Sequence, residues 1–93
     1  MMPRAKTSHL VTFNGVSIST HHADSGQGLE RHQHPYAHLT MCHAGSIRVS
    51  NERRSLVMTK GTQPVNLVAN EWHEIEALED GTVFVNVFAE GKY

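Results

Sequence analysis

The sequence predicts one small all-β domain, built as a sandwich or a barrel. Hydrophobic residues recur with a period of two along nearly the whole chain, a pattern typical of strands that bury one face. Turn residues interrupt this pattern every eight to twelve positions or so, a spacing that favours sandwiches and barrels. A length of 93 residues leaves room for a single hydrophobic core. We therefore expect one domain without helices.

The turn signals divide the chain into eight or nine short strands. Asn14-Gly15 suits a type I′ turn, because both of its positions must take a positive φ, and it should close a first hairpin. Pro35 should end a strand, because it cannot donate to the ladder. The expected strands cover residues 10–13, 16–19, 29–34, 39–44, 47–50, 55–59, 65–68, 72–78 and 83–88.

We expect the folded domain to span residues 9–90, after a flexible N-terminal tail at 1–8. Cys42 is the one cysteine, so an intrachain disulfide and a zinc site with several thiolates are both excluded. Stability must then come from packing, from a metal held by other ligands, or from association. Cys42 itself is interpreted as a small core residue.

Composition excludes several classes of function. Eight Lys and Arg face nine Asp and Glu, which leaves no basic footprint for DNA or RNA. The longest apolar stretches fall far short of the roughly 20 residues that span a bilayer. Two basic residues near the start have no apolar stretch behind them, so we expect no secretory signal and a cytoplasmic protein.

Eight histidines are the unusual feature of this composition. His32 and His34 lie two apart on an expected strand, so both should leave the same face, roughly 6.6 Å apart along its axis. On a straight strand His38 would lie about 20 Å from His32, too far to share an ion. The chain must turn at Pro35 for His38 to come beside His34. The position of His73, on a much later strand, does not follow from spacing.

The other histidines are interpreted as surface or structural residues, because nothing in their spacing links them to a common site. These surface or structural residues are His9, His21, His22 and His43. For the pair His32 and His34 alone, metal ligation and a structural role both stay open.

The segment from Gly28 to Gly45 resembles the first motif of the cupin family. His32 and His34 with one residue between them, the gap of three residues to His38 and the six residues before Gly45 all match that motif in register. Two positions differ. Gly28 stands three rather than five residues before His32, and His38 stands where the family has glutamate.

The run Trp72-His73-Glu74-Ile75 resembles the second cupin motif, although the proline and glycine of that motif are missing. The resemblance covers roughly residues 12–88. It implies a double-stranded β-helix, or jelly-roll barrel, with metal ligands inside one mouth. The ligand set that it implies is His32, His34, His38 and His73, around one divalent transition metal ion.

The implied ligands leave the metal unnamed, because imidazole suits Zn, Cu, Fe and Ni alike, and Mn and Co also stay among the candidates. The ligands do affect the net charge of the metal site. Four neutral imidazoles around a divalent ion leave that site with a net charge of about +2, whereas three histidines and a glutamate leave about +1. We therefore expect a stronger Lewis acid than the usual set gives, and one carboxylate fewer to carry protons.

The resemblance implies a metal-dependent enzyme acting on a small organic molecule. A dioxygenase is one candidate, and a Lewis-acid isomerase, lyase or cyclase is the other. Tyr36 is a weak catalytic candidate, with packing in the loop as its other interpretation. Asn86 is either a pocket amide or an outward polar residue. The alternative function is a non-catalytic module that binds a metal or a sugar and acts as a sensor.

We also expect a homodimer. Leu39 and Met41 have the opposite parity to His38, so they should lie on the outer face of the sheet, where apolar side chains need cover. No other macromolecular partner is expected.

Overall fold

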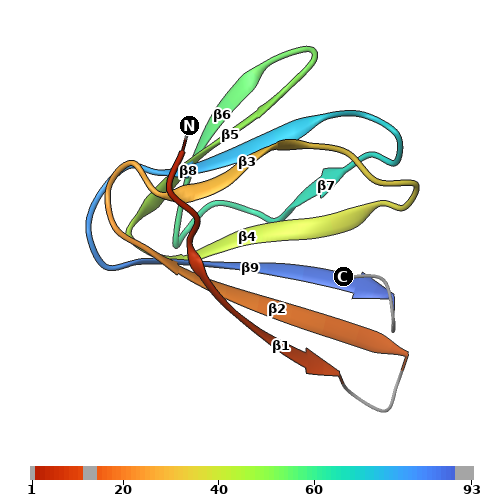
Figure 1. Cartoon of the computed structure of the whole chain (residues 1–93), viewed down its shortest axis with the longest axis horizontal. Coiled ribbons are helices and arrows are strands. Elements are labelled where there is room, and N and C mark those ends of the chain that lie inside the picture. The colour runs from red at the N-terminus through yellow and green to blue at the C-terminus, as the bar shows by residue number, and fades with distance from the viewer. Residues whose placement is uncertain (1, 12–14, 90–93) are drawn as a thin grey trace.

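The computed structural model describes residues 2–11 and 15–89, and these residues form nine strands and no helix (Figure 1). The strands are β1 (Lys6–Val11), β2 (Val16–Ala23), β3 (Gly28–His32), β4 (His38–Ala44), β5 (Ser46–Asn51), β6 (Ser55–Thr59), β7 (Val65–Leu67), β8 (His73–Ala77) and β9 (Thr82–Ala89). The all-β prediction is confirmed. Within the described ranges, no helix is long and apolar enough to cross a membrane.

Two antiparallel sheets make up the fold. One has the strand order β1-β2-β9-β4-β7 and the other β3-β8-β5-β6. In Figure 1 the sheet with β4, β9, β2 and β1 lies below the sheet with β3, β8, β5 and β6. From β3 onward the chain passes repeatedly from one sheet to the other, as in a jelly roll. The first hairpin is present, with Val11 opposite Ser17, while residues 12–14 of its expected turn lie outside the described residues.

The hydrophobic core lies between the two sheets. Burial alternates along β8 and β9, as a period of two requires. The largest apolar side chains that are fully buried are Phe84, Ile47, Met58, Leu67 and Ile75. Burying a side chain of this size contributes about 1.5–3 kcal/mol.

Polar side chains occupy many of the inward positions of β2, β4 and β9. On β2 the inward residues are Ser17, Ser19 and His21, whereas Val16 and Ile18 are only half-buried. The hydrophobic pattern of this strand alone would have turned Val16 and Ile18 inward. The interior of the barrel is therefore polar beside its apolar core, which is unusual unless those groups have partners.

The N-terminal segment differs from the expected flexible tail at residues 1–8. Arg4 forms a parallel bridge with Gly28, and Ala5 is 4% exposed. The Ala5 N–H donates to the Gly28 carbonyl, and the Gly28 N–H donates to the Pro3 carbonyl, at 2.9 Å each. Lys6 already belongs to β1. Backbone pairing with the start of β3 thus brings residues 3–8 into the fold.

Two glycines allow close packing of the sheets. A Cβ on Gly28 would overlap the carbonyl oxygen of Ile75 on the neighbouring strand β8. Gly45 turns the chain from β4 to β5 with a φ of 73°, and a Cβ there would lie 2.9 Å from the Cα of Thr82. A side chain at either position would displace backbone.

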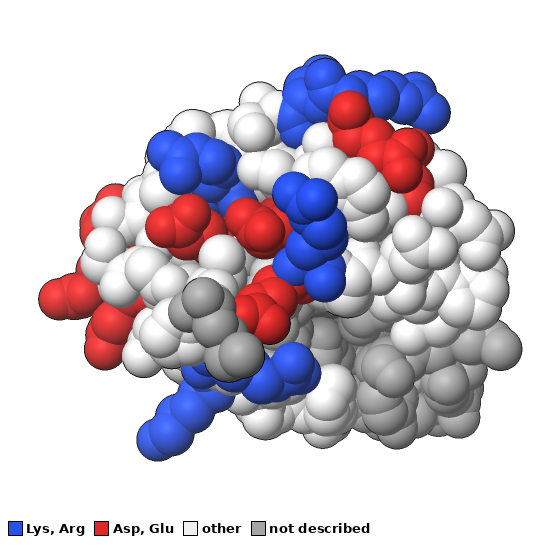
Figure 2. All heavy atoms as spheres, turned by 45° about the horizontal axis from the view of Figure 1, so that its top comes forward, with Lys and Arg blue, Asp and Glu red and all other residues white. Residues whose placement is uncertain are grey.

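Acidic and basic side chains are interspersed on the face shown in Figure 2. Two ion pairs join neighbouring surface positions, Arg48 with Glu76 at 3.5 Å and Arg53 with Glu71 at 3.3 Å. Exposed pairs of this kind contribute little stability. The mixture of both signs in Figure 2 leaves that face without a large field of one sign.

Candidate metal centre

A bulge in β3 turns His32 toward the interior. Leu29 pairs with Ile75 of β8, but His32 pairs with His73, so β3 holds one more residue than β8 between these two pairs. In a regular strand Leu29 and His32, three residues apart, would face opposite sides. The extra residue allows both to face the same side. His32 and His73 become cross-strand neighbours, with ring centroids 4.4 Å apart.

His34 lies beyond the end of β3, in the connection to β4. Its carbonyl accepts the N–H of Asn70 at 2.9 Å, and Asn70 adopts a left-handed φ of 63° to reach it. The ring of Tyr36 stacks on the His34 ring, with centroids 4.3 Å apart and planes 5° from parallel. Backbone and ring together hold His34 facing His73, at a centroid distance of 5.0 Å.

His38 begins β4, which belongs to the opposite sheet. It pairs with Leu67 of β7, not with any residue of β3. The chain therefore turns near Pro35, and the strand that follows joins the other sheet and does not pair with β3. His38 reaches the other histidines across the space between the sheets, with its ring 5.1 Å from that of His34 and 5.1 Å from that of His73.

The four histidines named by the sequence thus come together. The ligand nitrogens of His32, His34 and His73 all lie within 4.8 Å of one another. His38 lies outside that group of three, but its Nε2 is 3.4 Å from the Nε2 of His73. Nitrogens about 2.0–2.1 Å from a tetrahedral zinc ion are about 3.4 Å apart. The spacing of the His38 and His73 nitrogens already fits a shared ion, whereas the nitrogens of His32 and His34 lie within the wider limit of 4.8 Å from that of His73.

Backbone carbonyls face the Nδ1 atoms of three of these rings. Nδ1 of His32 faces the carbonyl of Glu30, and Nδ1 of His34 faces that of Tyr36 at 3.0 Å. Nδ1 of His38 lies 3.4 Å from the carbonyl of Leu39. A carbonyl can only accept, so Nδ1 carries the proton and Nε2 is left with a lone pair. This is the arrangement by which proteins orient histidines that ligate metals.

Burial keeps two of the rings neutral. Burial, the largest cause, and the neighbouring histidines of the cluster together lower the pKa of His38 to about 4 and that of His73 to about 3. The backbone of Glu71 opposes the shift in the pKa of His73, yet Nδ1 of His73 has no partner in hydrogen-bond geometry among the described residues. Both rings can therefore accept a cation at neutral pH without first losing a proton.

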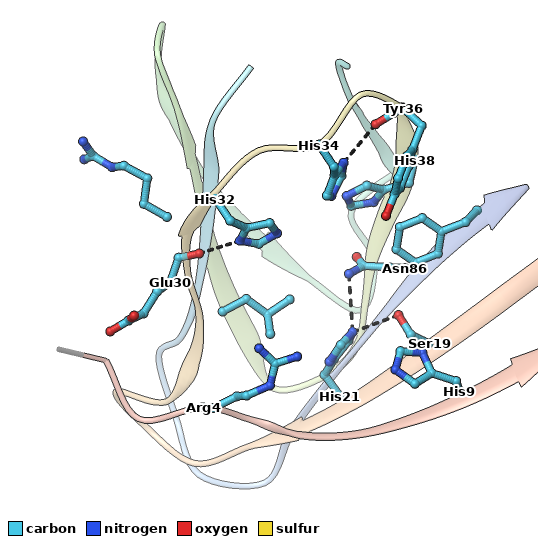
Figure 3. A pocket seen from close by; sticks show the side chains of 13 residues that line it. Arg4, His9, Ser19, His21, Glu30, His32, His34, Tyr36, His38 and Asn86 are labelled. Atoms are coloured by element: carbon cyan, nitrogen blue, oxygen red, sulfur yellow. Dashed lines mark hydrogen bonds between the residues drawn. The ribbon is translucent and has the colours of Figure 1, made fainter. Parts of the chain in front are cut away.

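A cavity of about 390 Å³ opens beside the histidines (Figure 3). His32, His34 and His38 line it on one side, and the apolar side chains of Leu29 and Phe88 contribute to its wall. Its volume suits a small organic molecule. The rings of His32, His34 and His38 therefore border the space in which such a molecule would bind.

Two histidines that the sequence did not assign to the site, His9 and His21, also line this cavity, as does Asn86, which the sequence left open between the pocket and the outer surface. His21 is 3% exposed and stacks on Phe84, with ring centroids 4.7 Å apart. Asn86 is also 3% exposed and faces the cavity, which settles the open choice for this residue in favour of the pocket. The inverted polarity of β2 hid His21, because the apolar residues beside it predict the opposite face. The other histidines, His9, His22 and His43, are exposed.

Cys42 is 4% exposed and packs in the core. Its thiol lies 3.4 Å from the carbonyl of Ala44, and burial raises its pKa. A buried thiol that holds its proton is neither a metal ligand nor a nucleophile. The sequence-based interpretation of Cys42 as a core residue agrees with this environment.

No protein-family model matches the chain, and no curated protein matches its sequence. Solved structures do match its fold. KdgF from Halomonas sp. superposes with a TM-score of 0.81 at 16% identity, over 92% of this chain and 80% of that one. A cupin superfamily protein from Desulfitobacterium hafniense superposes with a TM-score of 0.79 at 11% identity, over 97% and 81%.

Oxalate decarboxylase from Bacillus subtilis, a protein with Mn(II) centres, superposes with a TM-score of 0.76 at 21% identity. The match covers the whole of this chain but 27% of that one. The two sheets, their antiparallel strands and these superpositions show that the chain has the cupin fold, a double-stranded β-helix.

Proposed function

We propose that the chain binds one divalent transition metal ion through His32, His34, His38 and His73. One observation carries this proposal: side chains from β3, the following connection, β4 and β8 converge until their ring nitrogens are a few ångströms apart. Neutral imidazoles packed this closely gain little from one another. A shared cation would satisfy all four lone pairs at once.

The residues present fit such an ion by their chemistry. Four nitrogen donors without a carboxylate suit zinc, copper, iron and nickel better than calcium or magnesium. When bound, the ion would supply Lewis acidity toward a carbonyl or enolate oxygen, or the redox chemistry of a dioxygenase. The absence of a charged ligand leaves its full double charge to act on a substrate.

The proposed activity is that of an enzyme acting on a small organic molecule, either as a dioxygenase or as an isomerase, lyase or cyclase. The cavity supports this, because it places the His32, His34 and His38 rings beside a space large enough for a substrate. Leu29 and Phe88 would exclude water from one part of that space. Oxalate decarboxylase, which shares the fold, shows that it can carry an enzyme.

Tyr36 would act mainly by holding His34, since its ring is stacked on that imidazole. Its phenol is one candidate for a proton donor, and Glu30 and His9 also line the cavity. The second candidate function, a non-catalytic sensor that binds a metal or a sugar, is favoured by the lack of a carboxylate among the four clustered side chains themselves.

Turnover separates the two functions. The metal-loaded protein is incubated with diketones, hydroxy acids and sugars, and both oxygen consumption and product formation are recorded. The enzyme proposal expects conversion of at least one compound, with His34→Ala inactive and His43→Ala, at an exposed position on β4, fully active. Binding of a compound without any conversion by the wild-type protein would favour the sensor.

We infer in addition that the chain acts in the cytoplasm as a homodimer, through the outer face of the sheet that holds β4. Leu39 on that face is 41% exposed, which supports an apolar contact there. Analytical ultracentrifugation tests this association. Leu39→Lys should yield a monomer of unchanged fold, and a wild-type protein that is itself monomeric would contradict the proposed dimer.

A further inference from the structure

A chain of buried polar groups runs from the proposed metal centre to His21. Nδ1 of His38 lies 3.3 Å from the hydroxyl of Thr40, and that hydroxyl donates to Oδ1 of Asn86 at 2.7 Å. Nδ2 of Asn86 lies 3.4 Å from Nε2 of His21. All four side chains are at most 4% exposed, so no bulk water competes with these contacts. Figure 3 shows Asn86 between the His38 ring and His21.

The direction of each hydrogen bond follows from the amide. Oδ1 of Asn86 can only accept, so the Thr40 hydroxyl gives it its proton. With its proton committed, the hydroxyl oxygen can only accept from His38, and the proton of that ring belongs on Nδ1. Nε2 of His38 is then left with a lone pair, and it is Nε2 that faces His73.

The other end of the amide is fixed by His21. Nδ2 of Asn86 can only donate, so Nε2 of His21 accepts from it, as it does from the Ser19 hydroxyl at 2.9 Å. The proton of His21 then belongs on Nδ1, 2.7 Å from the hydroxyl of Thr7. A neutral ring is required for this, and burial, the largest cause, lowers the pKa of His21 to about 4.

If the side-chain amide of Asn86 were turned over, so that Nδ2 faced Thr40 and Oδ1 faced His21, the direction of each hydrogen bond in this chain would reverse. Nδ2 would donate to Thr40, the hydroxyl would donate to Nδ1 of His38, and the proton of His38 would move to Nε2. A protonated Nε2 cannot bind a cation. The orientation of the amide group therefore either supports or opposes the Leu39 carbonyl, the other acceptor near Nδ1 of His38, in leaving a lone pair on Nε2.

We propose that Asn86 is a positioning residue that fixes the tautomer of His38 through Thr40, with His21 holding the amide in the required orientation. The tautomer itself depends only on the hydrogen bonds described above. Its consequence for metal affinity rests on the proposed function. The two parts can be measured separately.

The tautomers are measured first, on the metal-free protein labelled with ¹⁵N-histidine, by long-range ¹H–¹⁵N correlation at pH 7. In the wild-type protein, His38 and His21 should both carry the proton on Nδ1. In Asn86→Leu the Thr40 hydroxyl loses its acceptor, donates to His38 instead, and moves the proton of His38 to Nε2. Nε2–H on His38 in the wild-type protein, or an unchanged tautomer in Asn86→Leu, would overturn the proposal.

A double variant distinguishes positioning from packing. Thr40→Val removes the competing hydroxyl with little change of shape. In the combination of Thr40→Val with Asn86→Leu, His38 should return to Nδ1–H, because the carbonyl of Leu39 is then its remaining partner. If Asn86 acted only by packing, the second substitution would add to the damage, and that result would contradict the proposal.

Zinc titration of the same proteins measures the consequence. Asn86→Leu should weaken zinc binding by about 10–100-fold, and the double variant should recover most of that loss. Asn66→Leu, at an exposed position of β7 in the same sheet, is the matched control and should bind as the wild type does. A wild-type protein that binds no zinc would contradict the proposed function, while the tautomer measurement would still decide the role of Asn86. Equal zinc affinity in Asn86→Leu and wild type would contradict the positioning role alone.

Discussion

His32 lies directly opposite His73 across the antiparallel pair of β3 and β8, and their rings meet edge to face at 4.4 Å. The bulge between Leu29 and His32 produces this pairing. Because a shift of one residue turns every following side chain to the other face, the bulge decides that His32 faces inward. The metal proposal depends on this local feature of β3.

Acid should destabilise the metal-free protein, partly through His21. The pKa of His21 is about 4 in the folded chain, against 6.5 for an unperturbed histidine. Between these values the unfolded chain binds a proton that the folded chain does not, so stability is lost as the pH falls from 6.5 toward 4 and is fully present above 6.5. The contribution of His21 to this slope is at most about 1.4 kcal/mol per pH unit.

Urea unfolding at pH 7, 6 and 5 measures this slope. In His21→Gln, which removes the titrating group and keeps a polar side chain, the loss of stability with acid should be smaller than in the wild type. His22→Gln changes the exposed neighbour and should leave the wild-type slope unchanged. Equal slopes for His21→Gln and the wild type would show that His21 does not titrate in this way.

His38→Glu should change the metal preference of the site. The substitution introduces the carboxylate that other cupins have at this position, and a hard oxygen ligand favours Mn²⁺ relative to Zn²⁺. We expect the ratio of the Mn²⁺ and Zn²⁺ dissociation constants to fall by about tenfold. Competition titrations with both ions measure that ratio, and an unchanged ratio would mean that residue 38 does not contact the ion.

Cys42 should resist chemical modification in the folded protein. The thiol is 4% exposed and its pKa is raised by burial, so both access and thiolate formation are reduced. A thiol-reactive disulfide reagent should modify the native protein at least about a hundredfold more slowly than the urea-unfolded protein. Similar rates would contradict the buried position of Cys42.

The sequence predicted most of the strands because one face of each is apolar and turn residues separate them. It also singled out His32, His34 and His38 through their parity and the turn at Pro35. It could not place His73, since pairing between strands forty residues apart is set by the topology of the whole barrel. It did not identify the neighbours of β4, because a turn after Pro35 does not say which sheet the next strand joins.

The polar interior was hidden for a different reason. Ser17, Ser19 and His21 alternate with residues that are more apolar, so hydrophobicity predicts that they face solvent. They face inward because hydrogen bonds among buried partners offset the loss of water, as between His21 on β2 and Asn86 on β9. Such partners lie on different strands, and the pattern along one strand does not contain them.

Metal stoichiometry tests the central claim most directly. The protein is purified without a histidine tag, dialysed, titrated with Zn²⁺ by calorimetry and analysed for bound metal by mass spectrometry. The account predicts one equivalent bound by the wild type and by His43→Ala, and affinity reduced by at least about tenfold in His73→Ala and His34→Ala. Less than about 0.1 equivalent of any transition metal in the wild type, or equal affinity in His73→Ala and His43→Ala, would contradict it.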